Sequence, residues 1–304
     1  MLTFHSFIPD VFSSPLVLAC GVFDGAHCGH QALLARAREL AASRAAAAVT
    51  LTFDPHPRAV LSPNEPPTLL TTLTQRLRLF EELGIGGCAV VNFTPEVSRW
   101  SAAKFVDFLR AEFPRLRGLT VGAGWRFGSG RSGDVMELRR LVGGGDVHLE
   151  VLPPVIYRGE RISSSRIRRT LATGNLAEAK IMLGRDFTLA GAVIKGRQVG
   201  RTLGFPTANL AARVPLPNGS YAARVEAGAS YPAVVYVGRR PTYGDDGEIL
   251  VEAHLLDVEV DLYGREIAVR FIRQIRGERQ FANEAELRRR IAADVEEARR
   301  AINN

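Results

Sequence analysis

The first half of the chain alternates short apolar runs with segments of helical periodicity. The apolar runs cover residues 16–19, 47–53, 89–93 and 119–122. Apolar residues recur three or four positions apart in a segment that begins near His30 and in segments 75–83 and 102–112. Continuously apolar strands that alternate with helices are typical of a parallel α/β sheet covered by helices. We therefore predict a Rossmann-like first domain.

The pattern changes near Gly184. From Thr188 onward, short alternating segments are separated by turns rich in glycine and proline, and they cover 188–194, 221–226, 233–237, 250–256 and 266–272. A final segment, 284–301, has helical periodicity. Short strands at this spacing predict an antiparallel β-barrel, here with a C-terminal helix. We therefore expect two domains, residues 1–182 and 183–304.

Composition agrees with a soluble protein of two domains. The chain has 304 residues, of which 46% are hydrophobic and 23% charged. No apolar run approaches the roughly 20 residues that a membrane helix needs, and the N-terminus has no signal-peptide features. We expect a cytoplasmic protein without a membrane partner. The three cysteines form no CxxC pair, which argues against a disulfide framework or a zinc site.

The net charge of +7 raises the question of nucleic acid binding. The basic residues are mostly scattered arginines, and the one tight cluster is Arg166, Arg168 and Arg169. No nucleic-acid-binding motif accompanies them. A small substrate rich in phosphate explains the excess equally well, so we expect no nucleic acid partner.

The most distinctive segment of the first half is Gly21–His30, with the sequence GVFDGAHCGH. It lies where a predicted strand turns into a helix, and ligands of open α/β sheets bind at such positions. Glycines let the backbone approach a phosphate, and a helix N-terminus attracts anions. His27 and His30 could donate hydrogen bonds to a triphosphate. The alternative is a pair of surface or metal-binding histidines.

A second candidate phosphate site is Ile162–Arg168, with the sequence ISSSRIR. Its serines precede a helix whose residues Ile167 and Leu171 share one face, and Gly174 ends that helix. Hydroxyl groups, amides of the helix start and Arg168 could hold the outer phosphates of ATP. A capped surface helix would have the same sequence pattern.

The second half contains the glycine-rich segment 191–209, which ends in Pro206-Thr207-Ala208-Asn209. It is not a Walker A loop, because no GxxxxGK[ST] pattern occurs. A hydroxyl and an amide two residues apart on a strand point to the same face. Their oxygens suit a Mg²⁺ ion that bridges phosphates. A flexible hairpin is the alternative.

These motifs together resemble the prokaryotic bifunctional riboflavin kinase/FMN adenylyltransferase (FAD synthetase) family. The resemblance covers nearly the whole chain. In the first half it includes 21–30, 53–57, 71–73, 122–128, 162–168 and 183–185. In the second half it includes 191–209, 217–221, 238–243, 252–257, 261–264 and 275–281.

The resemblance implies two ATP-dependent reactions, phosphorylation of riboflavin to FMN and adenylyl transfer to FMN, which gives FAD. For the adenylyltransferase it implies His27, His30 and Arg168 as catalytic residues. It implies ATP contacts from Gly21, Phe23, Asp24, Gly29, His56, Ser164 and Ser165. Catalysis would then consist of positioning and charge stabilisation, without a covalent intermediate.

For the kinase, the resemblance implies that Glu252 takes the proton of the riboflavin 5′-hydroxyl. Thr207 and Asn209 would be the Mg²⁺ ligands, with Gly196, Gly200 and Pro206 also at the ATP site. Flavin contacts would come from Trp125 and Phe127 in the first domain and from Arg276 and Glu278 in the second. A solvated strand carboxylate is the alternative for Glu252.

Two departures from the family pattern stand out. Members usually have Gly-x-Asp-Phe, or Asn-Phe, where this chain has Gly122-Ala123-Gly124-Trp125. A polar side chain is therefore missing, and Trp125 is the expected flavin contact. A core tryptophan is the alternative. The segment 236–238 also lacks the asparagine that members of the family often have before Ile-Gly. An enzyme with only the kinase activity and an RNA-binding protein on the same scaffold are alternative functions, and the oligomeric state stays open.

Overall fold

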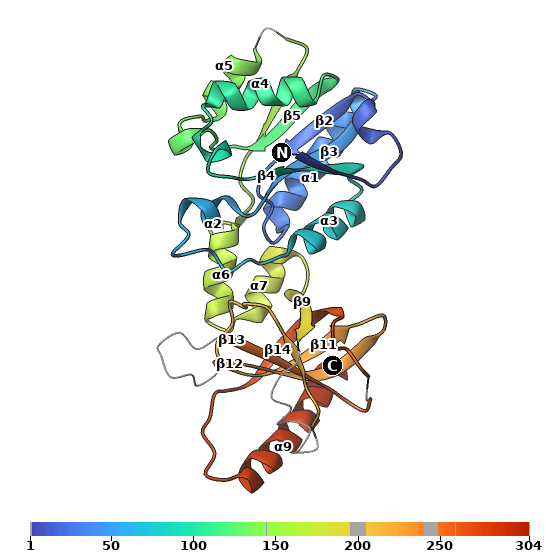
Figure 1. The fold of residues 1–304 in the computed structure, drawn as a ribbon, viewed down its shortest axis with the longest axis vertical. Helices are drawn as coiled ribbons and strands as arrows, with labels where there is room; N and C mark the ends of the chain where they lie inside the picture. The colour runs from blue at the N-terminus through green and yellow to red at the C-terminus, as the bar shows by residue number, and fades with distance from the viewer. Residues whose placement is uncertain (1, 144, 195–204, 240–248, 259, 304) are drawn as a thin grey trace. The chain divides into compact units, whose positions relative to one another are not determined.

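The chain folds into two compact units. The computed structural model describes residues 2–143, 145–194, 205–239, 249–258 and 260–303. The first unit consists of Met1–Pro67 and Leu73–Ser163, and the second of Thr68–Thr72 and Ser164–Asn304. Each unit has its own sheet, so the two can be described separately (Figure 1).

The first unit is built on a six-stranded sheet in the order β1-β4-β3-β2-β5-β6. Strand β1 pairs antiparallel with β4 at one edge, and all other pairs are parallel. A separate two-stranded hairpin consists of β7 and β8. The strands are β1 (Leu2–Ser6), β2 (Leu16–Cys20), β3 (Ala47–Asp54), β4 (Gly87–Asn92), β5 (Leu116–Gly122), β6 (His148–Leu152), β7 (Ile156–Tyr157) and β8 (Glu160–Arg161).

Helices cover both faces of this sheet (Figure 1). Alternate residues of β2 divide between two apolar cores, because side chains of a strand point to opposite faces. Leu16 and Leu18 pack with residues of α4 and α5, whereas Val17 and Ala19 pack with residues of α1 and α3. The helices are α1 (Cys28–Ser43), α2 (Pro57–Leu61), α3 (Leu73–Glu82), α4 (Ala102–Glu112) and α5 (Val135–Val142).

The direction in which successive strands are added to the sheet reverses at β2. The chain proceeds from β2 to β3 and β4 on one side, and later to β5 and β6 on the other. Because β2 is parallel to both β3 and β5, the segments that follow all three strands start at one edge. In open α/β sheets, this crevice is where ligands bind.

The second unit combines a closed barrel with the helices α6, α7 and α9. The barrel order is β10-β13-β12-β11-β14-β9, and every neighbouring pair for which a register is defined is antiparallel. Helix α9 lies outside it against β11, β12 and β14 (Figure 1). The elements are α6 (Ser164–Ala172), α7 (Leu176–Leu183), β9 (Thr188–Ile194), β10 (Ala208–Leu210), β11 (Gly219–Glu226), β12 (Ser230–Arg239), β13 (Ile249–Leu255), β14 (Glu266–Gly277) and α9 (Glu284–Asn303).

Aromatic side chains fill the barrel. The fully buried Tyr221 meets Phe271 edge-on, with 5.5 Å between ring centroids, and its hydroxyl donates to the carbonyl of Pro217 at 2.5 Å. Phe187 also stacks on Phe271, with 5.9 Å between ring centroids. On the outside, Ala222 of β11 packs with Ala298 of α9 in a small cluster. Small residues here let the helix approach the sheet.

The predicted fold class is confirmed. Helix 102–112 and strand 188–194 have the predicted bounds, and helix α1 begins at Cys28 rather than near His30. The structure adds β1, which pairs antiparallel with β4 at the edge of the sheet. Thr207 was expected on a strand together with Asn209, but β10 begins at Ala208 and Thr207 precedes it.

Two further expectations concern cysteines and membranes. Cys20, Cys28 and Cys88 form no disulfide, and Cys20 and Cys88 are buried. Burial raises the pKa of the Cys20 thiol to about 12. Among the described residues, no group of three or more His, Cys, Asp or Glu side chains could hold a metal ion. Nor does the described part of the chain contain a helix of the length and apolarity that spanning a bilayer requires.

The domain boundary at residues 182/183 stays a prediction, which two fragments can test. We expect 183–304 to fold cooperatively, because the barrel strands pair among themselves. A fragment 164–304 should be more stable by about 2 kcal/mol or more, since it also buries Ile167, Leu171 and Met182. Urea unfolding followed by circular dichroism measures both. If 183–304 is unfolded and 164–304 is folded, the boundary lies before α6.

Candidate active sites

His27 lies at the edge of the first sheet, between β2 and α1. It is the N-cap of α1, and its Nδ1 accepts a hydrogen bond from the backbone N–H of His30 at 3.3 Å. An accepting Nδ1 carries no proton, so the neutral ring carries its proton on Nε2. The side chain thus closes a helix start and presents a donor from the same ring, which is only 5% exposed.

The loop before His27 is shaped by close packing. The rings of His27 and His30 are stacked, with 3.6 Å between centroids and 16° between planes. Phe23 meets His30 edge-on at 5.2 Å. A Cβ on Gly29 would lie 3.2 Å from the His27 ring, and one on Gly21 would lie 3.1 Å from the Phe23 ring. Both glycines therefore leave space for these rings.

His56 follows the next strand, β3, and repeats the arrangement of His27. It is the N-cap of α2, and its Nδ1 accepts from the backbone N–H of Arg58 at 3.1 Å. The neutral ring again carries its proton on Nε2. Since β2 and β3 are parallel neighbours, both histidines follow strands that end at the same edge of the sheet.

Trp125 follows β5, the other neighbour of β2. Its ring stacks on Phe127, with 4.5 Å between centroids and 15° between planes, and lies 6.0 Å from the ring of Phe105 on α4. Trp125 is half-buried, whereas Phe127 is buried. A Cβ on the exposed Gly124 would lie 3.4 Å from a guanidinium nitrogen of Arg161. Trp125 therefore joins the core on one side, and its flavin contact stays a prediction.

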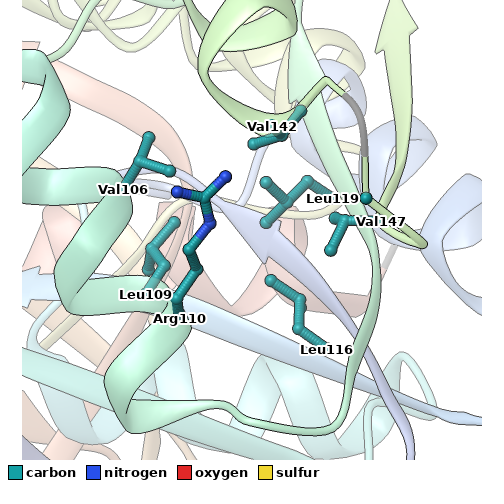
Figure 2. Close-up of a pocket in the computed structure, with 8 residues that line it drawn as sticks. Val106, Leu109, Arg110, Leu116, Leu119, Val142 and Val147 are labelled. Atoms are coloured by element: carbon teal, nitrogen blue, oxygen red, sulfur yellow. The ribbon is translucent and has the colours of Figure 1, made fainter.

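A small pocket of the first unit lies elsewhere (Figure 2). Its lining includes Leu116 at the start of β5 and Val147 just before β6, so it belongs to the amino ends of these strands. Arg110 of α4 reaches over it and donates to the carbonyl of Leu141 at 2.7 Å (Figure 2). The pocket therefore lies at the edge opposite to the histidine loops.

Ser164, Ser165 and Arg168 belong to the second unit, at the start of α6. As predicted, Ile167 and Leu171 are buried, and Gly174 adopts a left-handed φ of 77° after the helix end. The Arg168 Nε donates to the carbonyl of Thr68 at 2.6 Å. The phosphate roles of these three residues stay predictions.

The arginine cluster around α6 is not a simple basic surface. Arg166 is only 7% exposed, and its guanidinium lies 3.6 Å from a carboxylate oxygen of Glu178. A buried and paired arginine is unavailable to a polyanion. Arg166 therefore gives no support to the nucleic-acid alternative.

In the second unit, polar residues lie in register across neighbouring strands of the barrel. Asn209 of β10 is opposite Glu252 of β13, and Glu252 is opposite Tyr236 of β12. Tyr236 is opposite Ser220 of β11, and Ser220 is opposite Arg276 of β14. Directly opposed residues share one face of a sheet, with Cβ atoms about 5 Å apart. We call this set the polar row.

One end of the polar row has the features of a cation site. Asn209 is 3% exposed, and its Oδ1 accepts no hydrogen bond from the described residues. A buried oxygen without a donor fits a ligand that supplies positive charge. His254, two residues after Glu252, has its Nδ1 2.8 Å from the carbonyl of Pro206. The donating His254 ring thus ties down the residue before Thr207.

The other end of the polar row is held by α9. The Arg276 Nε donates to Oδ2 of Asp294 at 2.8 Å, and Asp294 is 2% exposed. The guanidinium of Arg276 also lies 5.4 Å from the ring of Phe281. A salt bridge and a cation–π contact thus fix the arginine while part of it stays accessible.

Glu278 follows β14 and connects back to the polar row. It accepts hydrogen bonds from Nδ2 of Asn218 at 2.9 Å and from the hydroxyl of Tyr236 at 3.1 Å. Burial and the nearby carboxylates of Glu278 and Glu252 raise the pKa of Tyr236 to about 12. The phenol is therefore a donor at neutral pH.

Comparison with known proteins places both units in known families. The family model for FAD synthetase matches residues 11–166, and the model for riboflavin kinase matches residues 183–302. The chain belongs to the FAD synthetase family. The predicted family is thereby confirmed.

Curated relatives match nearly the whole chain. A bifunctional riboflavin kinase/FMN adenylyltransferase from Escherichia coli K12 is 37% identical over 93% of this chain and 91% of its own length. The protein of the same name from Bacillus subtilis 168 is 33% identical over 95% of this chain and 93% of its own length. The region that matches FAD synthetase and the region that matches riboflavin kinase therefore have counterparts on one polypeptide in these relatives.

A solved structure shares the fold. It is titled a macrolide-efflux protein from Streptococcus pneumoniae, and it is 29% identical with a TM-score of 0.80. The match covers 97% of this chain and 95% of that one. The family models and the curated relatives above are named for FAD synthetase and riboflavin kinase, and none of them is named for macrolide efflux.

Each unit brings some of its predicted site residues together. In the first unit, His27, His30 and the loop from Gly21 to Gly29 are contiguous, and His56 follows the neighbouring strand. In the second, Asn209 and Glu252 are opposite each other. Gly196 and Gly200 lie outside the described residues.

Several neighbours of these sites were not predicted. Ser220 and Tyr236 belong to the polar row, while His254 and Asp294 hold its two ends. Glu252 and His254 are two apart on β13, which was a signal in the sequence that they share a face. Ser220 and Asp294 carried no such signal, because strand register and helix docking decide their contacts.

The titration of Tyr236 tests the geometry of the polar row. We expect Glu278→Gln to lower the pKa of Tyr236 from about 12 toward the ordinary value of about 10, because a neighbouring negative charge is removed. The phenol stabilises the fold fully below about pH 10, and this contribution is lost as pH rises through about 12. Phenolate absorbance, as a difference from Tyr236→Phe, measures the pKa.

The control for this titration is Glu266→Gln, which changes an exposed carboxylate on the same barrel. It should leave the pKa of Tyr236 unchanged. An unchanged pKa in Glu278→Gln as well would contradict the hydrogen bond between Tyr236 and Glu278.

Proposed function

We propose that this chain makes FMN from riboflavin and then FAD from FMN, with ATP as co-substrate in both steps. The observation that carries the proposal is that one chain matches both family models, and that relatives named for both activities match it over more than nine-tenths of its length. The geometry of each unit supports one of the two reactions.

For the kinase reaction, we assign Glu252 as the base. Its carboxylate takes the proton of the riboflavin 5′-hydroxyl, and the oxygen then bonds to the γ-phosphorus of ATP while ADP leaves. The cross-strand position of Glu252 beside Asn209 supports this role, because the base and the phosphate site must lie within reach of the same hydroxyl. Arg276 and Glu278 are proposed to contact the flavin from the other end of the polar row.

Mg²⁺ is the proposed metal of this site. The buried Oδ1 of Asn209 and the hydroxyl of Thr207 fit an ion that prefers oxygen ligands. When bound, the ion would neutralise phosphate charge and orient the γ-phosphoryl group. His254 supports the site by holding Pro206, so that Thr207 stays beside β13. Pro206, Gly196 and Gly200 are proposed as further ATP contacts.

For adenylyl transfer, we propose that an oxygen of the FMN phosphate attacks the α-phosphorus of ATP and that pyrophosphate leaves. His27 and His30 stabilise the charge that develops, and His56 contacts the phosphates, through ring N–H donors. The capping contacts of His27 and His56 support this, because Nδ1 faces the backbone and leaves the proton on Nε2. The helix start after His27 adds backbone amides.

The remaining residue assignments of this reaction are also proposals. Gly21, Phe23, Asp24 and Gly29 would shape the ATP loop, and Ser164, Ser165 and Arg168 would contact phosphates from the start of α6. Trp125 and Phe127 would offer the flavin a stacking surface. The stacked pair and the half-buried indole support this assignment.

Two other functions remain as candidates of lower rank. A chain with only the kinase activity would form FMN and stop, and an RNA-binding protein would bind polyanions without turnover. The salt bridge of the buried Arg166 weakens the second alternative. A cytoplasmic location is proposed from the substrates.

Incubation with riboflavin, ATP and Mg²⁺, followed by chromatography, tests the function, and a His27 variant separates the two sites. His27→Asn keeps an N-cap acceptor for α1 but removes the imidazole. We expect FAD formation from FMN to fall by about 10²–10³-fold, while FMN formation stays unchanged.

The control for the His27 variant is His148→Asn, which changes a partly exposed histidine on β6. It should keep both activities. Equal loss of both activities in His27→Asn would contradict separate sites, and FMN as the sole product of the wild type would favour the kinase-only alternative.

The base is tested by Glu252→Gln. This change keeps the size of the side chain and removes its basicity, so FMN formation should fall by about 10²-fold or more while conversion of added FMN to FAD continues. Glu266→Gln on the same barrel is the matched control and should have no effect. FMN formation within a few-fold of wild type would show that Glu252 has only a structural role.

A further inference from the structure

A buried arginine of the first unit connects the two histidine loops. Arg76 is on α3, and its side chain is 3% exposed. It extends from the helix to the carboxyl ends of β2 and β3, the strands that precede His27 and His56. The sequence analysis did not identify it, because one arginine in an amphipathic helix has no distinctive pattern.

The guanidinium of Arg76 makes hydrogen bonds on both sides. Its Nη1 lies 2.9 Å from the carbonyl oxygen of Val22, 3.0 Å from the hydroxyl of Thr52 and 3.2 Å from the carbonyl oxygen of Phe53. Its Nη2 donates to Oδ1 of Asp54 at 3.1 Å. The Thr52 hydroxyl in turn donates to the Val22 carbonyl at 3.0 Å. One side chain thereby joins the segment after β2 to the carboxyl end of β3.

The segment after Val22 requires such support. Phe23 and Ala26 have φ values of 55° and 37°, which side chains rarely adopt, and Gly25 between them has a φ of 82°. Strained backbone of this kind persists only where the surroundings hold it. Phe23 and Ala26 are fully buried, and the anchored Val22 carbonyl fixes the point at which the loop begins.

The charge of Arg76 is retained despite burial. Burial lowers the pKa of its guanidinium, and the carboxylates of Asp54 and Asp24 oppose this shift. An arginine stays protonated in proteins. A planar group with several donors can satisfy these four acceptors in fixed directions, whereas the ammonium of lysine cannot reproduce this arrangement.

We propose that Arg76 is a positioning residue for adenylyl transfer. It keeps the distance between His27 and His56 fixed, because it holds the chain where both loops begin. The inference rests on the proposed function of the first unit. Arg76 contacts neither substrate nor reacting atoms in this role, because its four hydrogen bonds to the segments at β2 and β3 all go to the protein. It acts through the geometry of the loops.

The test compares Arg76→Lys with Arg78→Lys in the full chain. Arg78 is an exposed arginine on the same helix. Arg76→Lys keeps the charge and changes the hydrogen-bond geometry, so kcat/KM for FAD formation should fall by about 10–100-fold, with KM for ATP raised. FMN formation by the same protein should stay within twofold of wild type. Arg78→Lys should change neither activity.

A second variant and a binding measurement separate positioning from stability. Thr52→Val removes the hydroxyl that links Arg76 with Val22 and should cause a smaller loss in the same direction. Rates are divided by the folded fraction from thermal unfolding. The proposal is overturned if the corrected kcat and KM of Arg76→Lys lie within threefold of wild type, because Arg76 then only stabilises the fold.

Failure of the proposed function is distinguishable from failure of this inference. If wild type forms no FAD, the proposed function of the first unit is wrong and the positioning role fails with it, whereas wild type that forms FAD leaves the role of Arg76 to be decided by the variants and by ATP affinity. Calorimetry with the Glu252→Gln chain reports ATP binding without FMN formation. An ATP affinity that Arg76→Lys leaves unchanged would overturn the positioning role, and an affinity lowered about tenfold or more would support it.

Discussion

Strand β2 has parallel neighbours on both sides, and this pairing decides where the chemistry of the first unit can lie. Because β3 and β5 both run parallel to β2, the loops that carry His27, His56 and Trp125 leave the sheet at one edge. The two apolar cores on either face hold the strands in place. The histidines are then fixed locally, since each accepts a backbone hydrogen bond at the start of a helix. Rigid strands and helix starts give the site a precision that loops alone would not provide.

In the second unit, strand register rather than a shared sheet edge positions the site residues. Here the polar residues come from strands that pair antiparallel, and opposite positions in the register bring Asn209, Glu252 and Tyr236 side by side although they are far apart in the sequence. A shift of one residue would turn each of them to the other face. The barrel core around Tyr221 and Phe271 opposes such a shift, because it would bring polar side chains into the interior.

The sequence predicted these two architectures well where local pattern decides the structure. Apolar periodicity identified α4 and β9 with their observed bounds, and the glycine and histidine spacing marked the loop before α1. It did not reveal β1, whose partner strand β4 is more than 80 residues away in the chain. The polar row and the contacts of Asp294 and Arg76 also escaped prediction. Each depends on how distant segments dock, and a single sequence contains no direct record of docking.

The left-handed residues before His27 have a consequence for how this loop can change in evolution. Glycine would adopt the angles of Phe23 without strain, but it would remove a ring that contacts both His30 and Phe80. A β-branched residue would fill part of the space and could not easily adopt the angle. A substitution that relieves the backbone strain therefore loses the ring contacts, and a substitution that keeps part of the packing keeps the strain. Few residue types therefore fit this position. We expect substitutions in this enzyme family to occur around the loop rather than within it.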